Sequence, residues 1–597
     1  MLLQALVRYY EILSDDEESG IPKLGYGKVK VSYALNISKD GDLLNLIPLK
    51  ILDSKGKKEV ATPMIVPEQT KRSSGVSANF LCDNANYVLG IDVKGNTKFE
   101  AFKALHKQII DNVECDEAKA VINFLEKWDT EKAEEHTEII GCLKDIYGGA
   151  NFVFMLDGEN DFIHNNSVIK KAWQMYKSGS SSSTQKQCLV TGEKSPIARL
   201  HPVVKGIKGG QAMGNSLVSF NARAYESYGN DECQGLNSPV SEYACFAYGT
   251  ALNFLLSDNS HKISLGDATI VFWAETTNKC NQDWFSMAIE PNEIDNPRFV
   301  RDEGAVKDIK SVFEKIANGQ KIALNQETDE DVQFYILGLS PNAARLSIRF
   351  FIKDSFAVFV NRIIKHYQDM AIEKQFDNDF NSISVWKLLN ETVSPNSSDK
   401  SASPLLAGSV LRSILTGSSY PTALYNAVMI RIRAERNINY YKASIIKAYL
   451  TRRENNDNYK EVLTMALNEK SENKPYVLGR LFAVLEKTQK DANPGINSTI
   501  KDKFFISACS TPEIVFPRLL ELSNHHIKKS EYGFLSIKKI AELMDVLNVD
   551  DSPFPKNLTL EEQGVFILGY YHQVNATFRE IKEASENKKN KNNLEEK

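Results

Sequence analysis

The chain has 597 residues, of which 42% are hydrophobic and 25% charged, and its formal net charge is −5 at pH 7. This length is enough for two to four domains with apolar cores, and the composition excludes a disordered or fibrous protein. The acidic balance excludes a protein that coats nucleic acid by its overall charge, so any contact with phosphates must come from local basic zones.

The first third of the chain predicts strands. Over 28–38 every second residue is apolar or aromatic, which is the period of a half-buried strand. Asp40-Gly41 predicts a hairpin turn into a second strand over 43–52. The chain then predicts a polar loop at 67–86, helices from about 97 to 142, and a flexible serine-rich connection at 178–186.

The middle of the chain combines short strands with a glycine-rich loop at 199–221. A helix should begin at Asn237-Ser238-Pro239, where a polar cap precedes proline. Residues 268–275 predict a buried strand, and 333–353 predicts two strands around a turn. In the second strand we expect Leu346, Ile348, Phe350 and Ile352 on one face and Arg345, Arg349 and Lys353 on the other.

From about 355 onward the pattern is helical, so strands in front and helices behind predict an α+β protein. We expect a β-rich mixed N-terminal domain followed by an all-helical C-terminal bundle. The predicted boundaries are 1–354 for the mixed domain, 355–460 for a helical connecting region, 461–585 for the bundle and 586–597 for a disordered tail.

The glycine-rich loop first raises the question of nucleotide binding, because 209–216 reads G-x-x-x-x-G-N-S. A P-loop needs lysine where Asn215 stands, and it follows a buried strand and opens a helix. Neither condition holds here, so the sequence excludes this kind of site. The glycines either form tight turns between strands or let backbone N–H groups approach a sugar-phosphate chain, and both interpretations stay open.

Other kinds of site find little support. The eight cysteines are scattered without a C-x-x-C pair, and there is no H-E-x-x-H motif, so we expect free thiols, no metal and no other cofactor. Cys188 with His201, and the pair His525-His526, more simply have structural roles. The sequence has no apolar run long enough for a membrane span and no signal peptide at its start, so we expect a cytoplasmic protein.

Three basic zones remain as candidates for contacts with nucleic acid or another subunit. One surrounds the glycine-rich loop, one lies on the 333–353 hairpin, and one lies in 419–453, where Tyr425, Tyr440, Tyr441 and Tyr449 alternate with cations. Cations can hold phosphates and aromatic rings can stack on bases, although each zone taken alone could be a solvated face. The candidates are Arg199, Lys205, Lys208, Gln211, Asn215, Arg345, Arg349, Lys353, Arg431, Arg433 and Arg436.

Several long segments resemble the large subunit of type I-C CRISPR surveillance (Cascade) complexes. They include "KRSSGVSANFLCDNANYVLG", "CLVTGEKSPIARLHPVVKGIKGGQAMGNSLVSFNARAYESYG", "YILGLSPNAARLSIRF" and "YVLGRLFAVLEKTQKDANPGINSTIKDKFF", and they follow one another over nearly the whole chain. The resemblance implies a subunit without catalytic activity that recognises a protospacer-adjacent motif in duplex DNA. It also implies that the subunit promotes strand opening, steadies the displaced strand and helps to recruit a helicase-nuclease, while guide pairing supplies most specificity.

This resemblance gives the polar loop a role as reader of the flanking duplex, because amides and guanidinium groups can bond to groove edges. The candidate residues are Gln69, Thr70, Lys71, Arg72, Ser73, Ser74 and Asn79. The implied partners are the guide CRISPR RNA, target double-stranded DNA with its displaced strand, the other Cascade subunits and the recruited helicase-nuclease, with no membrane.

The helical rear resembles the small subunit of such complexes, which can arise by internal translation of the same gene. Met465 is the best-placed internal start, unless it is an ordinary structural methionine. Two other functions stay open. One is an endoribonuclease that processes guide RNA, with His201 as the suspected catalytic group, and the other is a purely structural scaffold subunit.

Overall fold

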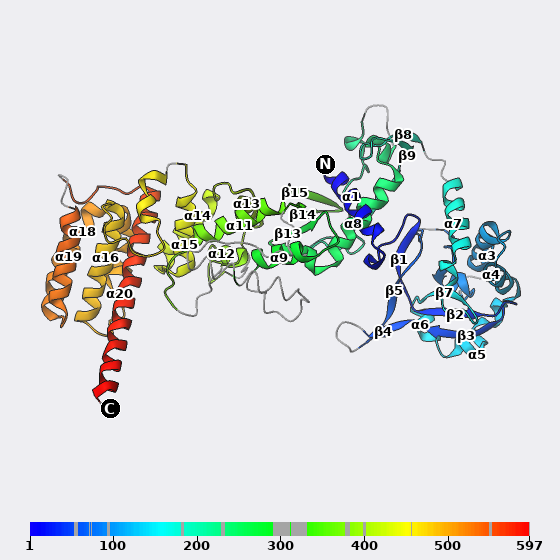
Figure 1. The fold of residues 1–597 in the computed structure, drawn as a ribbon, viewed down its shortest axis with the longest axis horizontal. Coiled ribbons are helices and arrows are strands. Elements are labelled where there is room, and N and C mark those ends of the chain that lie inside the picture. Colours follow the sequence, from blue (N-terminus) through cyan, green and yellow to red (C-terminus); the bar gives the residue numbers. More distant parts are fainter. Residues whose placement is uncertain are drawn as a thin grey trace. The chain divides into compact units, whose positions relative to one another are not determined.

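The computed structural model describes residues 1–52, 58–70, 72, 75–91, 96–180, 184–227, 233–290, 311, 331–376, 383–397, 402–454, 456–547 and 552–595. The predicted α+β class is confirmed (Figure 1). Residue contacts divide the chain into unit 1, Met1–Val204 with Ser216–Phe254, and unit 2, Lys205–Asn215 with Leu255–Lys597. This division differs from the predicted boundary at 354 because Phe334 and Phe350 of the 333–353 hairpin share one apolar core with the helices that follow.

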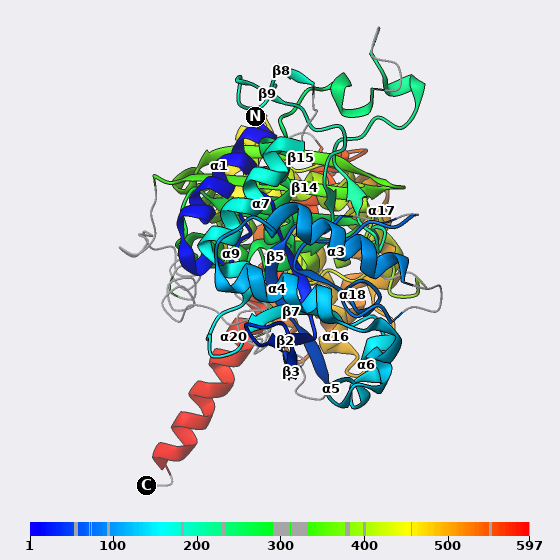
Figure 2. The same ribbon diagram turned by 90° about the vertical axis from the view of Figure 1, so that its right-hand side faces the viewer.

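The centre of unit 1 is a four-stranded sheet in the order β3-β2-β7-β6. Its strands are β2 (Tyr33–Ile37), β3 (Leu43–Pro48), β6 (Cys82–Asn84) and β7 (Asn151–Leu156), and only the β2–β7 pair is parallel. Helices α3 (Thr97–Ile110) and α4 (Asp116–Lys127) lie beside this sheet in both Figures 1 and 2. All five residues of β2 are buried, so the strand is covered on both faces and not on one as its alternation suggested.

A second sheet of unit 1 has the order β1-β5-β4, with β1 (Tyr26–Val31), β5 (Glu59–Pro67) and β4 (Lys50–Leu52) antiparallel. The predicted strand over 28–38 is therefore two strands, β1 and β2, that meet at Ser32 and join different sheets. Because Tyr26 pairs with Pro67, the start of β1 lies at the root of the polar loop that follows β5.

The remaining elements of unit 1 surround these sheets. They are α1 (Leu2–Asp15), α2 (Ala85–Val88), α5 (Thr137–Ile140), α6 (Leu143–Tyr147), α7 (Ser167–Ser180), β8 (Gln185–Gln187), β9 (Lys194–Pro196) and β10 (Val203–Val204). The predicted helix after Pro239 is α8 (Glu242–Ser257). The indole N–H of Trp173 in α7 donates to the carbonyl oxygen of Gly25 at 2.7 Å, and this buried bond ties α7 to the start of β1.

Unit 2 begins with an antiparallel sheet in which strands follow the order β15-β14-β13-β12. The strands are β12 (Lys262–Leu265), β13 (Ala268–Ala274), β14 (Gln333–Asn342) and β15 (Arg345–Ser355), with the short β11 (Asn215–Ser216) at the end of the glycine-rich loop. The buried strand and the hairpin predicted from the sequence are confirmed. Helices α9 (Cys280–Ile289), α11 (Phe356–Met370), α12 (Val385–Asn390), α13 (Pro404–Thr416), α14 (Thr422–Glu435) and α15 (Tyr440–Thr451) follow.

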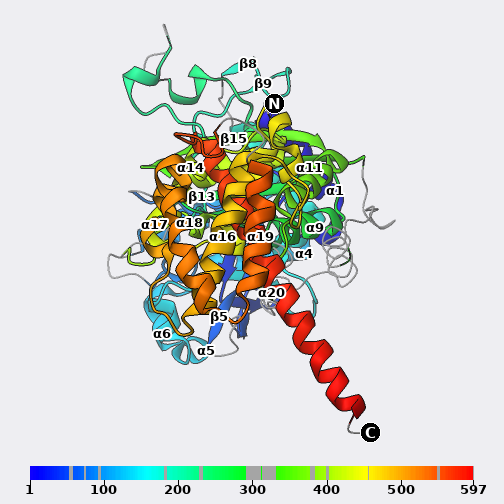
Figure 3. The same ribbon diagram turned by 90° about the vertical axis from the view of Figure 1, so that its left-hand side faces the viewer.

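The rear of unit 2 is a helical bundle, seen from its own side in Figure 3. It contains α16 (Lys474–Ala492), α17 (Ile500–Ser510), α18 (Pro512–Lys529), α19 (Gly533–Leu547) and α20 (Leu560–Glu595). A Cβ at Gly479 would lie 2.0 Å from the carbonyl oxygen of Phe566, so α16 and α20 are in backbone contact. Helix α20 continues over 586–595, where composition predicted a disordered tail, because its Lys, Glu and Asn residues are compatible with a helix.

Among the helices that the structure describes, none is both long enough and apolar enough to cross a membrane.

Candidate nucleic-acid interface

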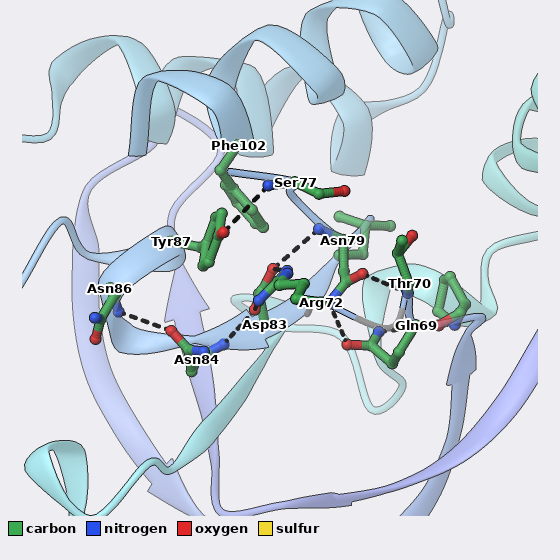
Figure 4. A network of polar contacts seen from close by, with 12 residues as sticks. Gln69, Thr70, Arg72, Ser77, Asn79, Asp83, Asn84, Asn86, Tyr87 and Phe102 are labelled. Atoms are coloured by element: carbon green, nitrogen blue, oxygen red, sulfur yellow. Dashed lines mark hydrogen bonds and ion pairs between the residues drawn. The ribbon is translucent and has the colours of Figure 1, made fainter. Parts of the chain in front are cut away.

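The polar loop after β5 is organised around one buried carboxylate, that of Asp83 (Figure 4). The Arg72 guanidinium approaches it with both terminal nitrogens, donating from Nη1 to Oδ1 at 2.9 Å and from Nη2 to Oδ2. Two backbone N–H groups also donate to this carboxylate, from Asn79 at 2.9 Å and from Asn84 at 2.8 Å. Four donors therefore converge on one anion, which is the arrangement that makes a buried charge tolerable.

Arg72 is also held from its other side. Its guanidinium carbon lies 3.9 Å from the centroid of the Tyr87 ring, and the Tyr87 hydroxyl oxygen accepts a hydrogen bond from the Ser77 N–H at 3.2 Å. A guanidinium that is stacked on a ring and paired with a carboxylate has little freedom to reorient. Arg72 therefore braces the loop from within and is not a free reader of groove edges, which corrects the role expected from the sequence.

Gln69 and Asn79 close the loop at its root. The Asn79 side chain donates to Gln69 Oε1 at 2.7 Å and accepts from the Thr70 N–H at 2.8 Å, while Gln69 Nε2 donates to the Pro67 carbonyl at 3.0 Å. These bonds hold the chain on both sides of the loop tip in one conformation. The side chain of Thr70 remains exposed, and so does Val76, which is 50% exposed.

His106 supports the loop from α3. Burial lowers its pKa to about 4, so the imidazole is neutral. Its Nε2 accepts from the Leu81 N–H at 3.0 Å and its Nδ1–H donates to the Phe102 carbonyl at 2.7 Å. Leu81 itself has φ of 51°, the left-handed region, and the histidine bond satisfies its buried N–H in that conformation. The loop thus ends on a strained residue fixed by the core.

Of the seven residues predicted for this loop, the structure describes Gln69, Thr70, Arg72 and Asn79, and it brings all four into one connected network. Lys71, Ser73 and Ser74 lie outside the described residues. Asp83 and Tyr87, which organise the network, were not among the predicted site residues. The signal that could have found Asp83 is its position in "CDNAN", an acid beside an Asn that caps the following helix.

The glycine-rich loop is built around Asn215, the residue that replaces the P-loop lysine. Asn215 is 1% exposed. Its Oδ1 accepts from the Gln211 N–H at 3.0 Å, and its Nδ2 donates to the Ala343 carbonyl at 2.8 Å and the Arg345 carbonyl at 3.4 Å. A Cβ at Gly210 would lie 2.5 Å from that Oδ1, so glycine is needed there for close approach. Asn215 therefore fastens the loop to the β14–β15 turn from inside and is not itself a surface contact.

Around this loop several predicted side chains reach the surface of unit 2. Lys205, Lys208 and Gln211 are exposed, and Lys208 Nζ donates to the Gly266 carbonyl at 3.1 Å. On β15, Arg349 pairs with Asp267 at 3.3 Å, and Lys353 lies 5.6 Å from the Tyr335 ring. A β-bulge opposite Gly338 and Leu339 interrupts the predicted alternation of β15, and Ile348, expected on the buried face, is 50% exposed.

In unit 1, Arg199 is exposed and its Nε donates to Gln234 Oε1 at 2.9 Å. His201 lies against α8, with Nδ1 2.7 Å from the Tyr248 hydroxyl and 3.4 Å from Cys245 Sγ, and burial lowers its pKa to about 4.

Cys188 takes part in a different set of contacts, and its sulfur accepts from the Ser241 N–H at 3.2 Å. Burial raises the pKa of this thiol, but donors from Ser241 and Thr191 outweigh that effect and bring it to about 7. Within the described part of the chain, Cys188 and His201 are therefore held by different partners and form no nucleophile–base pair.

The third predicted zone, in 419–453, is wrong as a binding surface for most of its residues. Tyr425 and Tyr449 stack on each other with centroids 4.2 Å apart inside the core, and the Tyr425 hydroxyl donates to the Leu560 carbonyl at 2.7 Å. Arg452 is buried and donates from Nε to Asp369 at 2.7 Å. Of the three predicted residues, Arg431 pairs with Glu435, Arg433 Nη2 donates to Gln563 at 2.6 Å, and Arg436 is exposed.

The fold and these two loops define an α+β protein that presents polar and basic side chains from braced turns at the ends of its sheets. Residues 6–578 match the family described as CRISPR-associated protein (Cas_Csd1). The match covers nearly the whole chain, so the chain belongs to this family and is a Cascade-type large subunit. No curated protein matches the chain.

Proposed function

We propose that the chain is the large subunit of a type I-C complex, where it recognises the protospacer-adjacent motif, promotes strand opening, steadies the displaced strand and helps to recruit the helicase-nuclease. The family match over residues 6–578 carries this proposal. The geometry of the 67–86 loop supports it, because groove readout needs polar groups held on a rigid support. In this loop the Asp83 network supplies the support, and exposed Thr70 with the adjacent backbone faces solvent.

The test uses the assembled complex with its guide RNA and two target duplexes that differ only in the flanking motif. We expect tight binding and strand opening on the target with the motif and little of either on the other. A Thr70→Ala variant should narrow the difference between the two targets. Equal binding of both targets by the wild-type complex would refute motif recognition by this subunit.

We further propose that the chain makes and breaks no bond in this role. The position of His201 supports this, because its Nδ1 is engaged with Tyr248 and its burial keeps it neutral, so it is poorly placed to receive an RNA hydroxyl. Incubation of the purified chain with precursor guide RNA tests the alternative. Specific cleavage that is lost in His201→Gln would show that the chain is a processing endoribonuclease.

The rear bundle fits a second proposed product of the same gene. Met465 lies between α15 and α16, is 40% exposed, and precedes all five bundle helices. Its carbonyl accepts from the Glu373 N–H at 2.7 Å, so it also has a structural contact in the full chain. Mass spectrometry of the purified complex should find a fragment that starts at Met465, and Met465→Leu should abolish that fragment while leaving the full chain in place.

A further inference from the structure

Two lysines of β1 lie on an exposed face of the β1-β5-β4 sheet. Lys28 and Lys30 are two residues apart in the strand, so they point to the same side, and both are exposed. Val29 and Val31 point to the opposite side and pack in a small apolar cluster with Val66 and Val153. Among the described residues neither Lys28 nor Lys30 forms an ion pair, whereas Lys50 of β4 pairs with Asp145 at 2.5 Å.

The register of the sheet connects these lysines with the polar loop. Lys30 lies opposite Pro63, Lys28 opposite Ile65, and Tyr26 opposite Pro67, where β5 ends and the loop begins. Lys28 is thus about 7 Å of strand from the root of the loop, and Lys30 about twice that distance. The acid that shares this face of β5, Glu59, lies four residues beyond Pro63 at the far end of the strand.

The loop itself lacks a free cation in its described part, because Arg72 is paired with Asp83. Proteins that read a groove nevertheless direct half to two-thirds of their hydrogen bonds to phosphates and sugars, and these bonds set the register on the duplex. A DNA-reading loop with no available cation needs positive charge beside it. Lys28 and Lys30 supply that charge on the strand that begins at the root of the loop.

We propose that Lys28 and Lys30 hold backbone phosphates of the duplex whose flanking motif the 67–86 loop contacts. This inference rests on the proposed function of that loop. The lysine ammonium groups act as point charges that neutralise two phosphates and release their counterions, so their contribution depends on salt and not on base sequence. They position the duplex on the β1-β5-β4 face, and discrimination between sequences is left to the loop.

The experiment compares assembled complexes that contain Lys28→Gln/Lys30→Gln with a matched control, Lys39→Gln/Lys132→Gln. The control removes two exposed lysines of the same unit that pair with Asp116 and Asp129. Duplex binding is measured between about 50 and 200 mM salt on targets with and without the flanking motif. Each lost phosphate contact should lower the slope of log K against log salt by about 0.9, so the loss of affinity over this range shrinks about tenfold for the first variant.

The control should keep the wild-type slope, and the first variant should change it equally on both targets. Three results would overturn the inference: an unchanged slope in Lys28→Gln/Lys30→Gln, an effect confined to the target with the motif, or loss of guide RNA from the complex with unchanged DNA binding. Failure of the proposed function gives a different result, because the wild-type complex would then bind both targets equally whatever its salt slope. Unchanged melting temperatures exclude misfolding of either variant.

Discussion

The Arg72–Asp83 pair offers the sharpest test of how the candidate loop is held. The Asp83 side chain is 2% exposed and that of Arg72 is 20% exposed. Arg72→Ala leaves the carboxylate buried with only the N–H groups of Asn79 and Asn84. Removing one partner from a fully buried pair costs about 3–5 kcal/mol. Because two donors remain and Arg72 is partly exposed, we expect the free energy of loop opening to fall by about 2–3 kcal/mol.

Hydrogen exchange of the full chain measures this opening directly. A fall of about 2–3 kcal/mol corresponds to exchange about 30- to 150-fold faster at the amides of Asn79 and Asn84, with no change in α4. Arg72→Lys keeps the charge but loses the two-nitrogen contact, so its effect should lie between the wild type and Arg72→Ala. Arg72→Ala/Asp83→Asn should be less open than Arg72→Ala, because no unpaired charge remains. Wild-type exchange rates in Arg72→Ala would refute the brace.

Three further predictions concern other parts of the chain. Asn215→Ala removes three hydrogen bonds from a buried side chain, so exchange at Gln211 should accelerate by about one to two decades, while Lys205→Ala on the exposed side should leave it unchanged. Gly479→Ala forces α16 away from α20 and should lower the stability of the bundle by about 3 kcal/mol or more, whereas Gly408→Ala in α13, with nothing within 4 Å, should raise stability slightly; equal melting temperatures would contradict the close packing. Burial lowers the pKa of His106 to about 4 and those of His366 and His572 to about 3, so stability is fully present above the ordinary pKa of about 6.5 and falls by up to about 1.4 kcal/mol per pH unit for each histidine as pH drops toward 4, which thermal unfolding between pH 7 and 5 would show and a flat profile would contradict.

The sequence predicted the elements of this fold better than their assignment to units. The strand at 268–275 and the 333–353 hairpin were correct as elements because β-branched and aromatic runs bounded by turn residues report local structure. The hairpin nevertheless belongs with the helices behind it, since Phe334 packs on Phe356 and Phe359 with centroids 5.1 and 5.8 Å apart. Such long-range packing leaves no periodic signal.

The candidate sites show a related difficulty, because a list of cations does not reveal where their charges are spent. Arg452 and Lys447 looked like parts of a basic surface with interleaved tyrosines. In the structure Lys447 Nζ donates to the Asp369 carbonyl at 3.0 Å, burial lowers its pKa to about 8, and Arg452 pairs with the Asp369 side chain. The partner is some 80 residues away in the chain, so no local pattern announces it. Lys28 and Lys30 were overlooked for the opposite reason, since two lysines in a strand look like an ordinary solvated edge.

The internal use of Arg72 changes what the loop can contribute to recognition. A free arginine would have to lose its side-chain entropy on binding, whereas a loop already closed around Asp83 has lost that entropy during folding. The network should therefore matter more for discrimination between targets than for overall affinity, because a loosened loop can still lie near a duplex but cannot hold one set of hydrogen bonds. Asp83→Asn in the assembled complex should reduce the ratio of affinities for targets with and without the flanking motif and leave the salt slope unchanged. An equal loss on both targets, together with a smaller slope, would mean that the loop contacts phosphates and that Asp83 has no part in selecting the motif.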